Sequence, residues 1–119
     1  MNEFVNWLDS ILGKPLISEI VAVNFNLYEN GNNQWSMELV GTSSFDAEDS
    51  DWACDEVFAA RDTPLSWTED TTWETILAKA ICEIEAYLGN GRYAEKLKSY
   101  DGVGVGFVDG DITIVYKSS

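Results

Sequence analysis

Residues 21–40 read VAVNFNLYENGNNQWSMELV. On both sides of the Asn- and Gly-rich centre, apolar residues alternate with polar ones, which is the two-residue period of a strand with one buried face. We therefore predict two antiparallel strands, within residues 18–29 and 34–45, joined as a hairpin. The apolar residues of their shared face are Val21, Val23, Phe25, Leu27, Trp35, Met37 and Leu39.

The register of this hairpin depends on the length of its turn. A two-residue loop at 30–31 would place Leu27 opposite Gln34 and mix the two faces, whereas a three-residue loop at 30–32 places Leu27 opposite Trp35. A slip by one residue moves every side chain of a strand to the other face. We therefore predict the three-residue loop, which also pairs Phe25 with Met37 and Val23 with Leu39.

Helical spacing appears before and after the hairpin. Near the N-terminus, a stripe ends at Gly13 and Pro15, a typical cap and stop. Residues 71–88 form the longest stripe, and Thr71 and Glu74 resemble a capping box at its start. A short helix over 92–99 is expected to follow. The first stripe is Phe4, Val5, Leu8, Ile11 and Leu12, with Trp7 beside it; the long one is Trp73, Ile76, Leu77, Ala80, Ile81, Ile84, Tyr87 and Leu88.

A second hairpin is predicted over residues 102–117, with a two-residue turn at Asp109–Gly110. It would pair Val103 with Tyr116, Val105 with Ile114 and Phe107 with Ile112. Its glycines lack the helix and lysine of a phosphate-binding loop, so they indicate a bulge or the close approach of another element. We therefore predict one α+β domain over residues 1–119. In it, a mostly antiparallel sheet is built from two hairpins, with the N-terminal and central helices packed on one face.

Negative charge is concentrated between the hairpin and the long helix. Residues 45–70, the acidic segment, hold nine acids against Arg61 alone, and the chain has a net charge of −14 and a pI of about 4.1. This charge disfavours nucleic acid and anionic membranes as partners, because both are bound through clustered Lys and Arg. Trp52 and Trp67 lie within the segment, which argues against a solvated tail. The acids are Asp46, Glu48, Asp49, Asp51, Asp55, Glu56, Asp62, Glu69 and Asp70.

This composition indicates a surface that binds a basic protein. Two roles stay open for Trp52: an exposed anchor ringed by acid, or a core residue beneath acids that alone face the partner. Residues 52–58 could form a short strand or a single helical turn, and Pro64 is expected to interrupt regular structure nearby. The predicted partner-binding residues are Asp46, Glu48, Asp49, Asp51, Trp52, Asp55 and Glu56.

The residue types give little support to catalysis. The chain has no histidine, which removes imidazole bases and most zinc sites. The acids fail the calcium-loop pattern, since a loop starting at Asp46 would have Asp51 in place of the required glycine. We predict no enzyme activity, metal or cofactor. Cys82 is expected to be a buried small hydrophobe and Cys54 a structural thiol, both reduced. With no signal peptide and no membrane-spanning run, we predict a cytoplasmic protein.

Residues 39–58, LVGTSSFDAEDSDWACDEVF, resemble a signature of small, acidic, uncharacterised bacterial proteins, some of which resemble immunity proteins of toxin–immunity systems. The resemblance centres on Asp51-Trp52-Ala53-Cys54. It implies a cytosolic protein that binds and neutralises a cognate toxin domain. Two alternatives stay open. One is a self-associating structural protein that dimerises through the glycine-bearing hairpin or an exposed apolar surface, and the other is a small carboxylate enzyme.

Overall fold

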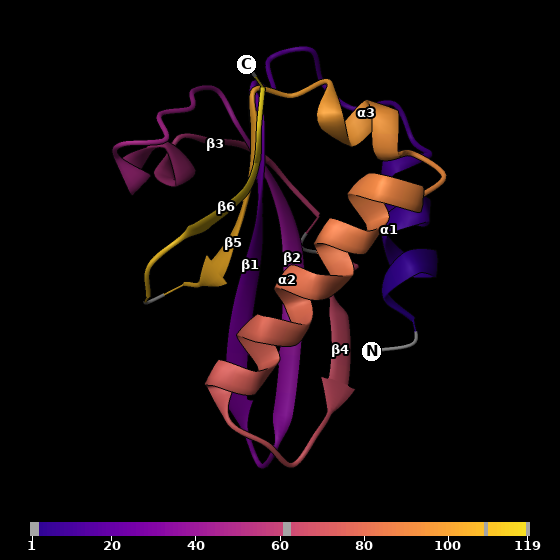
Figure 1. Ribbon diagram of the computed structural model, residues 1–119, viewed down its shortest axis with the longest axis vertical. Coiled ribbons are helices and arrows are strands. Elements are labelled where there is room, and N and C mark those ends of the chain that lie inside the picture. Colours follow the sequence, from indigo (N-terminus) through magenta and orange to yellow (C-terminus); the bar gives the residue numbers. More distant parts are fainter. Residues whose placement is uncertain (1–2, 61–62, 109, 119) are drawn as a thin grey trace.

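The computed structural model describes residues 3–60, 63–108 and 110–118 (Figure 1). Within them the chain folds in the order helix, hairpin, acidic segment with two short strands, two helices and a second hairpin. The elements are α1 (Phe4–Leu12), β1 (Ala22–Gly31), β2 (Gln34–Thr42), the 3-10 helix η1 (Ser50–Cys54), β3 (Glu56–Ala59), β4 (Leu65–Thr68), α2 (Trp73–Asn90), α3 (Ala94–Lys98), β5 (Gly102–Phe107) and β6 (Thr113–Lys117).

The described strands form one sheet in the order β3-β2-β1-β5-β6. Strands β3 and β4 both pair with β2, at opposite ends of the same edge, where they meet residues 40–42 and 34–37. All neighbours are antiparallel except β1 and β5, which are parallel. The predicted α+β class with a mostly antiparallel sheet is therefore confirmed, while the parallel pair of β1 with β5 and the strand β4 go beyond the prediction.

The first hairpin has the predicted faces in a different register. Leu27 lies opposite Met37 and Phe25 opposite Leu39, two residues from the predicted pairing. A bulge between Glu29 and Gly31 absorbs the odd residue, and the chain turns at Asn32–Asn33. Both asparagines have positive φ, 54° and 62°, as a two-residue type I′ turn requires. Because the shift is an even number of residues, every side chain keeps its predicted face.

The second hairpin matches the prediction at one end only. Val103 pairs with Tyr116 as predicted, but a register shift between Val103 and Gly104 sets Val105 opposite Thr113, so its predicted pairing with Ile114 is wrong. The ladder does not include the predicted pair of Phe107 with Ile112. The predicted turn at Asp109–Gly110 includes Asp109, which lies outside the described residues.

The main core lies between the helices and one face of the sheet, which α2 crosses with α1 beside it (Figure 1). Phe4 of α1 contacts both Phe25 of β1 and Tyr87 of α2, at ring-centroid distances of 6.1 and 6.4 Å. In α1, Trp7 is buried while Val5 is 45% exposed, which reverses their predicted roles. The fully buried residues of this core include Phe4, Leu8, Phe25, Leu27, Met37, Leu39, Ile76, Ile84 and Val103.

The two C-terminal helices follow the predicted order with different ends. Helix α2 begins one residue later than the capping box implied: its N-cap is Thr72, whose hydroxyl accepts from the Thr75 N–H, so the predicted pairing of Thr71 with Glu74 is wrong. The short helix α3 lies within the predicted range 92–99. The hydroxyl of Tyr87 donates to the carboxylate of Asp9 at 2.6 Å and so ties α2 to α1.

Candidate partner-binding surface

The first part of the acidic segment packs on the face of the sheet opposite the helices. We call residues 45–56 the acidic loop. Its two aromatic rings, Phe45 and Trp52, meet at a centroid distance of 5.1 Å and 67°. They cover the glycines of β5: a Cβ added at Gly102 would lie within 2.6 Å of three Phe45 ring atoms, and one at Gly104 would lie 3.1 Å from Trp52. The glycines therefore serve the predicted close approach, and they seat the acidic loop.

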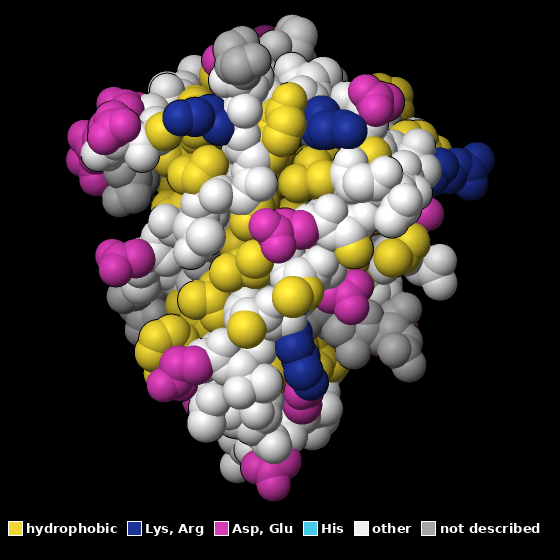
Figure 2. All heavy atoms as spheres, viewed as in Figure 1, with side chains coloured by type: hydrophobic (Ala, Val, Ile, Leu, Met, Phe, Trp, Pro, Cys, Tyr) yellow, Lys and Arg dark blue, Asp and Glu magenta, His cyan; other side chains and the backbone are white. Residues whose placement is uncertain are grey.

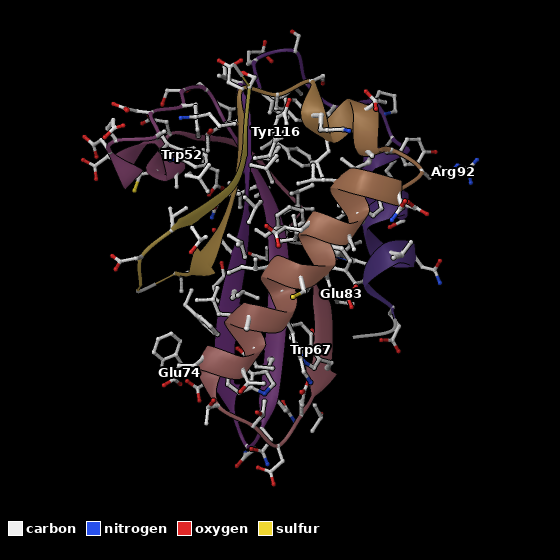
Figure 3. All side chains as sticks on the ribbon, in the orientation of Figure 1. Trp52, Trp67, Glu74, Glu83, Arg92 and Tyr116 are labelled. Atoms are coloured by element: carbon white, nitrogen blue, oxygen red, sulfur yellow. The ribbon has the colours of Figure 1, made fainter. Side chains whose placement is uncertain are left out.

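Trp52 is only 3% exposed, so it is not the exposed anchor that was one of its two roles. Its indole Nε1 and the Oδ1 of Asn24 are buried atoms without a hydrogen-bond partner in the structure. Both side chains meet the position that a Cβ of Gly104 would occupy. In Figure 3, Trp52 lies between η1 and the strands. Trp52 thus forms the base on which the acids stand.

All six acids of the acidic loop are exposed, and several of them also fix its backbone. Asp49 caps η1 by accepting from the Asp51 N–H at 3.0 Å, and Asp46 accepts from the Glu48 N–H at 2.9 Å. The carboxylate of Asp55 accepts from the Ser44 hydroxyl at 2.5 Å. The loop therefore holds its charges in defined positions rather than on a mobile tail.

The segment 52–58 contains both of the structures that its pattern allowed. Its first residues belong to η1 and its last ones to β3, with Asp55 between them. Of the remaining predicted acids, Glu69 lies beside Lys79, with which it forms an ion pair, and Asp70 is exposed. Asp62 and Arg61 lie outside the described residues.

A groove that the sequence did not reveal lies between the start of α2 and the turn that joins the two strands of the second hairpin. We call it the Trp73 groove; its volume is about 670 Å³. Trp73 is 50% exposed and Val108 is 55% exposed, although Trp73 was predicted to be in the core. The ring of Trp73 stands edge-on to Phe107, with centroids 6.1 Å apart. Its acidic lining residues are Glu29 and Asp111.

The Trp73 groove and the acidic loop are neighbours. A smaller hollow of about 260 Å³ is lined by Asp46 and Glu48 of the loop and also by Asp111, which lines the groove as well. Figure 2 shows hydrophobic side chains in a band beside α2, with Asp and Glu side chains along the left edge of the view. The apolar groove and the negatively charged loop are therefore separate regions that meet at Asp111.

The basic side chains lie mainly elsewhere. The ammonium of Lys96 donates to the carbonyls of Leu12 and Lys14, at 2.6 and 3.0 Å, and Lys98 lies 3.5 Å from Glu95. Lys and Arg side chains gather near α3 in Figure 2. None of the described residues that line the Trp73 groove or the smaller hollow is basic.

Both cysteines are free thiols, and both are exposed. The prediction that Cys82 is buried is wrong, because Ala80 and Ile84 face the core and a residue midway between them points to the other side of the helix. Cys54 is the last residue of η1 and lies exposed at the surface, whereas a structural thiol would be enclosed by the core.

The described residues offer neither a metal-binding cluster nor a membrane-spanning helix. Among the described residues, no group of three or more His, Cys, Asp or Glu side chains is placed to hold a metal ion. No helix within residues 3–60, 63–108 and 110–118 has the length and apolar composition to cross a membrane. Comparison of the chain with protein-family models, curated proteins and solved structures finds no match.

Proposed function

We propose that the protein is an acidic, non-catalytic protein-binding module of the immunity type. It would bind a basic toxin domain in the cytoplasm and cover that domain's functional site. The observation that carries this proposal is the acidic loop, whose six exposed carboxylates are held on the sheet by buried Trp52 and half-buried Phe45. No Lys or Arg interrupts residues 45–60.

The physics of such a surface favours fast capture of a positively charged protein. A cluster of like charges steers an oppositely charged partner and raises its association rate by roughly 10- to 1,000-fold, with a strong dependence on salt. A preformed loop also adds little ordering cost on binding, because its backbone is already fixed by Asp46, Asp49 and Asp55. Both properties suit an inhibitor that must reach its toxin before the toxin reaches its target.

The test uses a toxin candidate encoded beside the gene. That protein is expressed with and without the full chain, and growth is scored; binding is then measured by surface plasmon resonance at increasing salt. Charge is removed in a triple variant that keeps the Asp49 cap. The matched control removes the same charge from exposed acids outside the acidic loop. The two variants are Asp46→Asn/Glu48→Gln/Asp51→Asn and Glu3→Gln/Glu19→Gln/Glu85→Gln.

We expect the acidic-loop variant to lower the association rate about tenfold at low salt. The control variant should change it much less, and the difference should vanish near 1 M salt, where the Debye length is about 3 Å. Equal effects of the two variants would show that only net charge matters. Absence of salt-sensitive binding and of growth protection would contradict the proposed function.

A further inference from the structure

The Trp73 groove places two exposed apolar side chains, Trp73 and Val108, in a hollow of the described surface. Tryptophan and valine are half exposed side by side there, at the first turn of α2 and the end of β5. The ring of Trp73 stands edge-on to Phe107, which in turn packs against buried Trp35 at 6.1 Å. Tryptophan is enriched among interface hot spots, and a partly exposed tryptophan in a concave site can become buried by a partner.

We propose that the Trp73 groove is the apolar anchor site of the interface, and that it takes a bulky apolar side chain flanked by Lys or Arg on a protein partner. This inference rests on the proposed function, since the same basic partner is to meet the acidic loop. The argument for a basic flank is charge complementarity: the groove carries Glu29 and Asp111, and none of its described lining residues is basic.

A second copy of the chain fits the groove less well than a basic segment does. Each copy has a net charge of −14, and a symmetric contact would place Glu29 and Asp111 of one groove near the same acids of the other. Like charges brought together at an interface oppose association, and nothing basic in the described lining offsets them. The glycines of the second hairpin offer no alternative contact, since Phe45 and Trp52 already cover two of them.

The Trp73 groove meets the acidic loop at Asp111, so a partner bound in the groove would lie next to the loop. Because Asp111 lines both the groove and the hollow beside Asp46 and Glu48, one partner segment can contact both regions. The loop then provides the field that attracts the partner, and the groove provides the area that excludes water from the contact. The affinity of such a site depends more on its buried aromatic contact than on the acids at its edge.

The experiment uses the full ¹⁵N-labelled chain and three blocked peptides: Ac-KKLFKK-NH₂, Ac-EELFEE-NH₂ and Ac-KKSSKK-NH₂. The readouts are the indole N–H peak of Trp73, assigned with Trp73→Phe, and the amide peaks of Val108 and Asp111. Titrations are repeated with Trp73→Ala and with Val5→Ala, which truncates an apolar residue of similar exposure on α1. Far-UV circular dichroism and melting temperature check that both variants fold.

We expect Ac-KKLFKK-NH₂ to shift the Trp73 indole and the Val108 and Asp111 amides. Trp73→Ala should weaken its binding tenfold or more, about what the loss of a hot-spot residue causes, while Val5→Ala leaves it unchanged. Ac-KKSSKK-NH₂ should shift the acidic loop alone, and Ac-EELFEE-NH₂ should bind neither region.

Other outcomes would overturn the inference in distinguishable ways. If Ac-KKLFKK-NH₂ shifts only the acidic loop, and Trp73→Ala binds it as well as the parent chain does, the groove is not the anchor but a basic partner still fits. If Ac-EELFEE-NH₂ shifts the groove equally well, the site does not select a basic flank. If the chain sediments as a dimer at micromolar concentration and Trp73→Glu makes it monomeric, the groove is a self-association surface. If no peptide shifts either region, both proposals fail.

Discussion

Replacing Gly102 by alanine is expected to destabilise the protein, because the acidic loop rests on this glycine. Gly102 is buried in β5, and an added Cβ would lie within 2.6 Å of three atoms of the Phe45 ring. Carbon atoms at optimal contact are about 3.5–4.0 Å apart, so the ring must move outward by about 1 Å or more. Phe45 in turn touches Trp52, so the shift reaches the base of the acidic loop.

The magnitude follows from three contributions. Overpacking of a well-packed site costs about 1–3 kcal/mol. Loss of the edge-on contact between Phe45 and Trp52 costs a further 0.5–1.5 kcal/mol or so. Alanine also restricts the unfolded chain relative to glycine, which returns roughly 0.5–1 kcal/mol. We therefore expect a net loss of about 2 kcal/mol in the free energy of unfolding, most of it carried by Phe45.

The assay is urea unfolding followed by circular dichroism, with Gly102→Ala, Phe45→Ala and the double variant forming a cycle. In the absence of the Phe45 ring, alanine at 102 should be neutral or slightly stabilising. The coupling energy should then be about 2 kcal/mol, well above the roughly 0.3–0.5 kcal/mol error of additivity. Gly89→Ala is the matched control, since no atom lies within 4 Å of its added Cβ. It should stabilise α2 by up to about 1 kcal/mol.

Two results would refute this reasoning. If Gly102→Ala is as harmless as Gly89→Ala, the acidic loop does not rest on β5 in the way the contacts indicate. If Gly102→Ala lowers the free energy of unfolding by the same amount in the Phe45→Ala background, the cause lies in β5 itself and not in the Phe45 ring.

Two further predictions concern Tyr87 and the cysteines. Burial, together with the hydrogen bond to Asp9, raises the pKa of Tyr87 above its usual value of about 10. The contribution of Tyr87 to stability is therefore complete below pH 10 and is lost as the pH rises further. Tyr87→Phe should lower the free energy of unfolding by about 1 kcal/mol at pH 7. In urea titrations, the free energy of unfolding of this variant should also fall less steeply above pH 10 than that of the parent chain. Cys54 and Cys82 should both react with Ellman's reagent in the native protein, giving two equivalents without denaturant; a single equivalent would contradict their exposure.

Patterns within single elements were predictable from the sequence, because a side-chain period reports which face is buried. The faces of the first hairpin held even though its register moved by two residues. The register itself depended on the bulge at Gly31 and on the left-handed backbone of Asn32 and Asn33. Neither a two-residue loop at 30–31 nor a three-residue loop at 30–32 gives this register. Pro64 is expected to interrupt regular structure, yet β4 begins at the next residue, because proline is compatible with the start of an edge strand.

Contacts between distant elements were not predictable in this way. The alternation within residues 102–117 predicted a hairpin but not its neighbour in the sheet: β5 pairs in parallel with β1 and so lies between β1 and β6. A central strand with glycines on one face leaves that face bare, and another part of the chain must cover it. The acidic loop does so with Phe45 and Trp52, and this requirement appears only once the parallel pair is known.

The positions of Trp52 and Trp73 have different physical causes. Six like charges in a short loop repel one another, and burying Trp52 against the sheet offsets that repulsion, so a tryptophan among acids is better explained as a support than as an anchor. Trp73, by contrast, is the first residue of α2, where the helix has no earlier turn to cover it, and its ring meets Phe107 edge-on. The negative field and the exposed aromatic surface therefore lie on neighbouring but separate parts of the molecule, joined at Asp111. In a binding protein this separation has a kinetic consequence, since charge mainly sets how fast partners associate and buried aromatic area mainly sets how slowly they part.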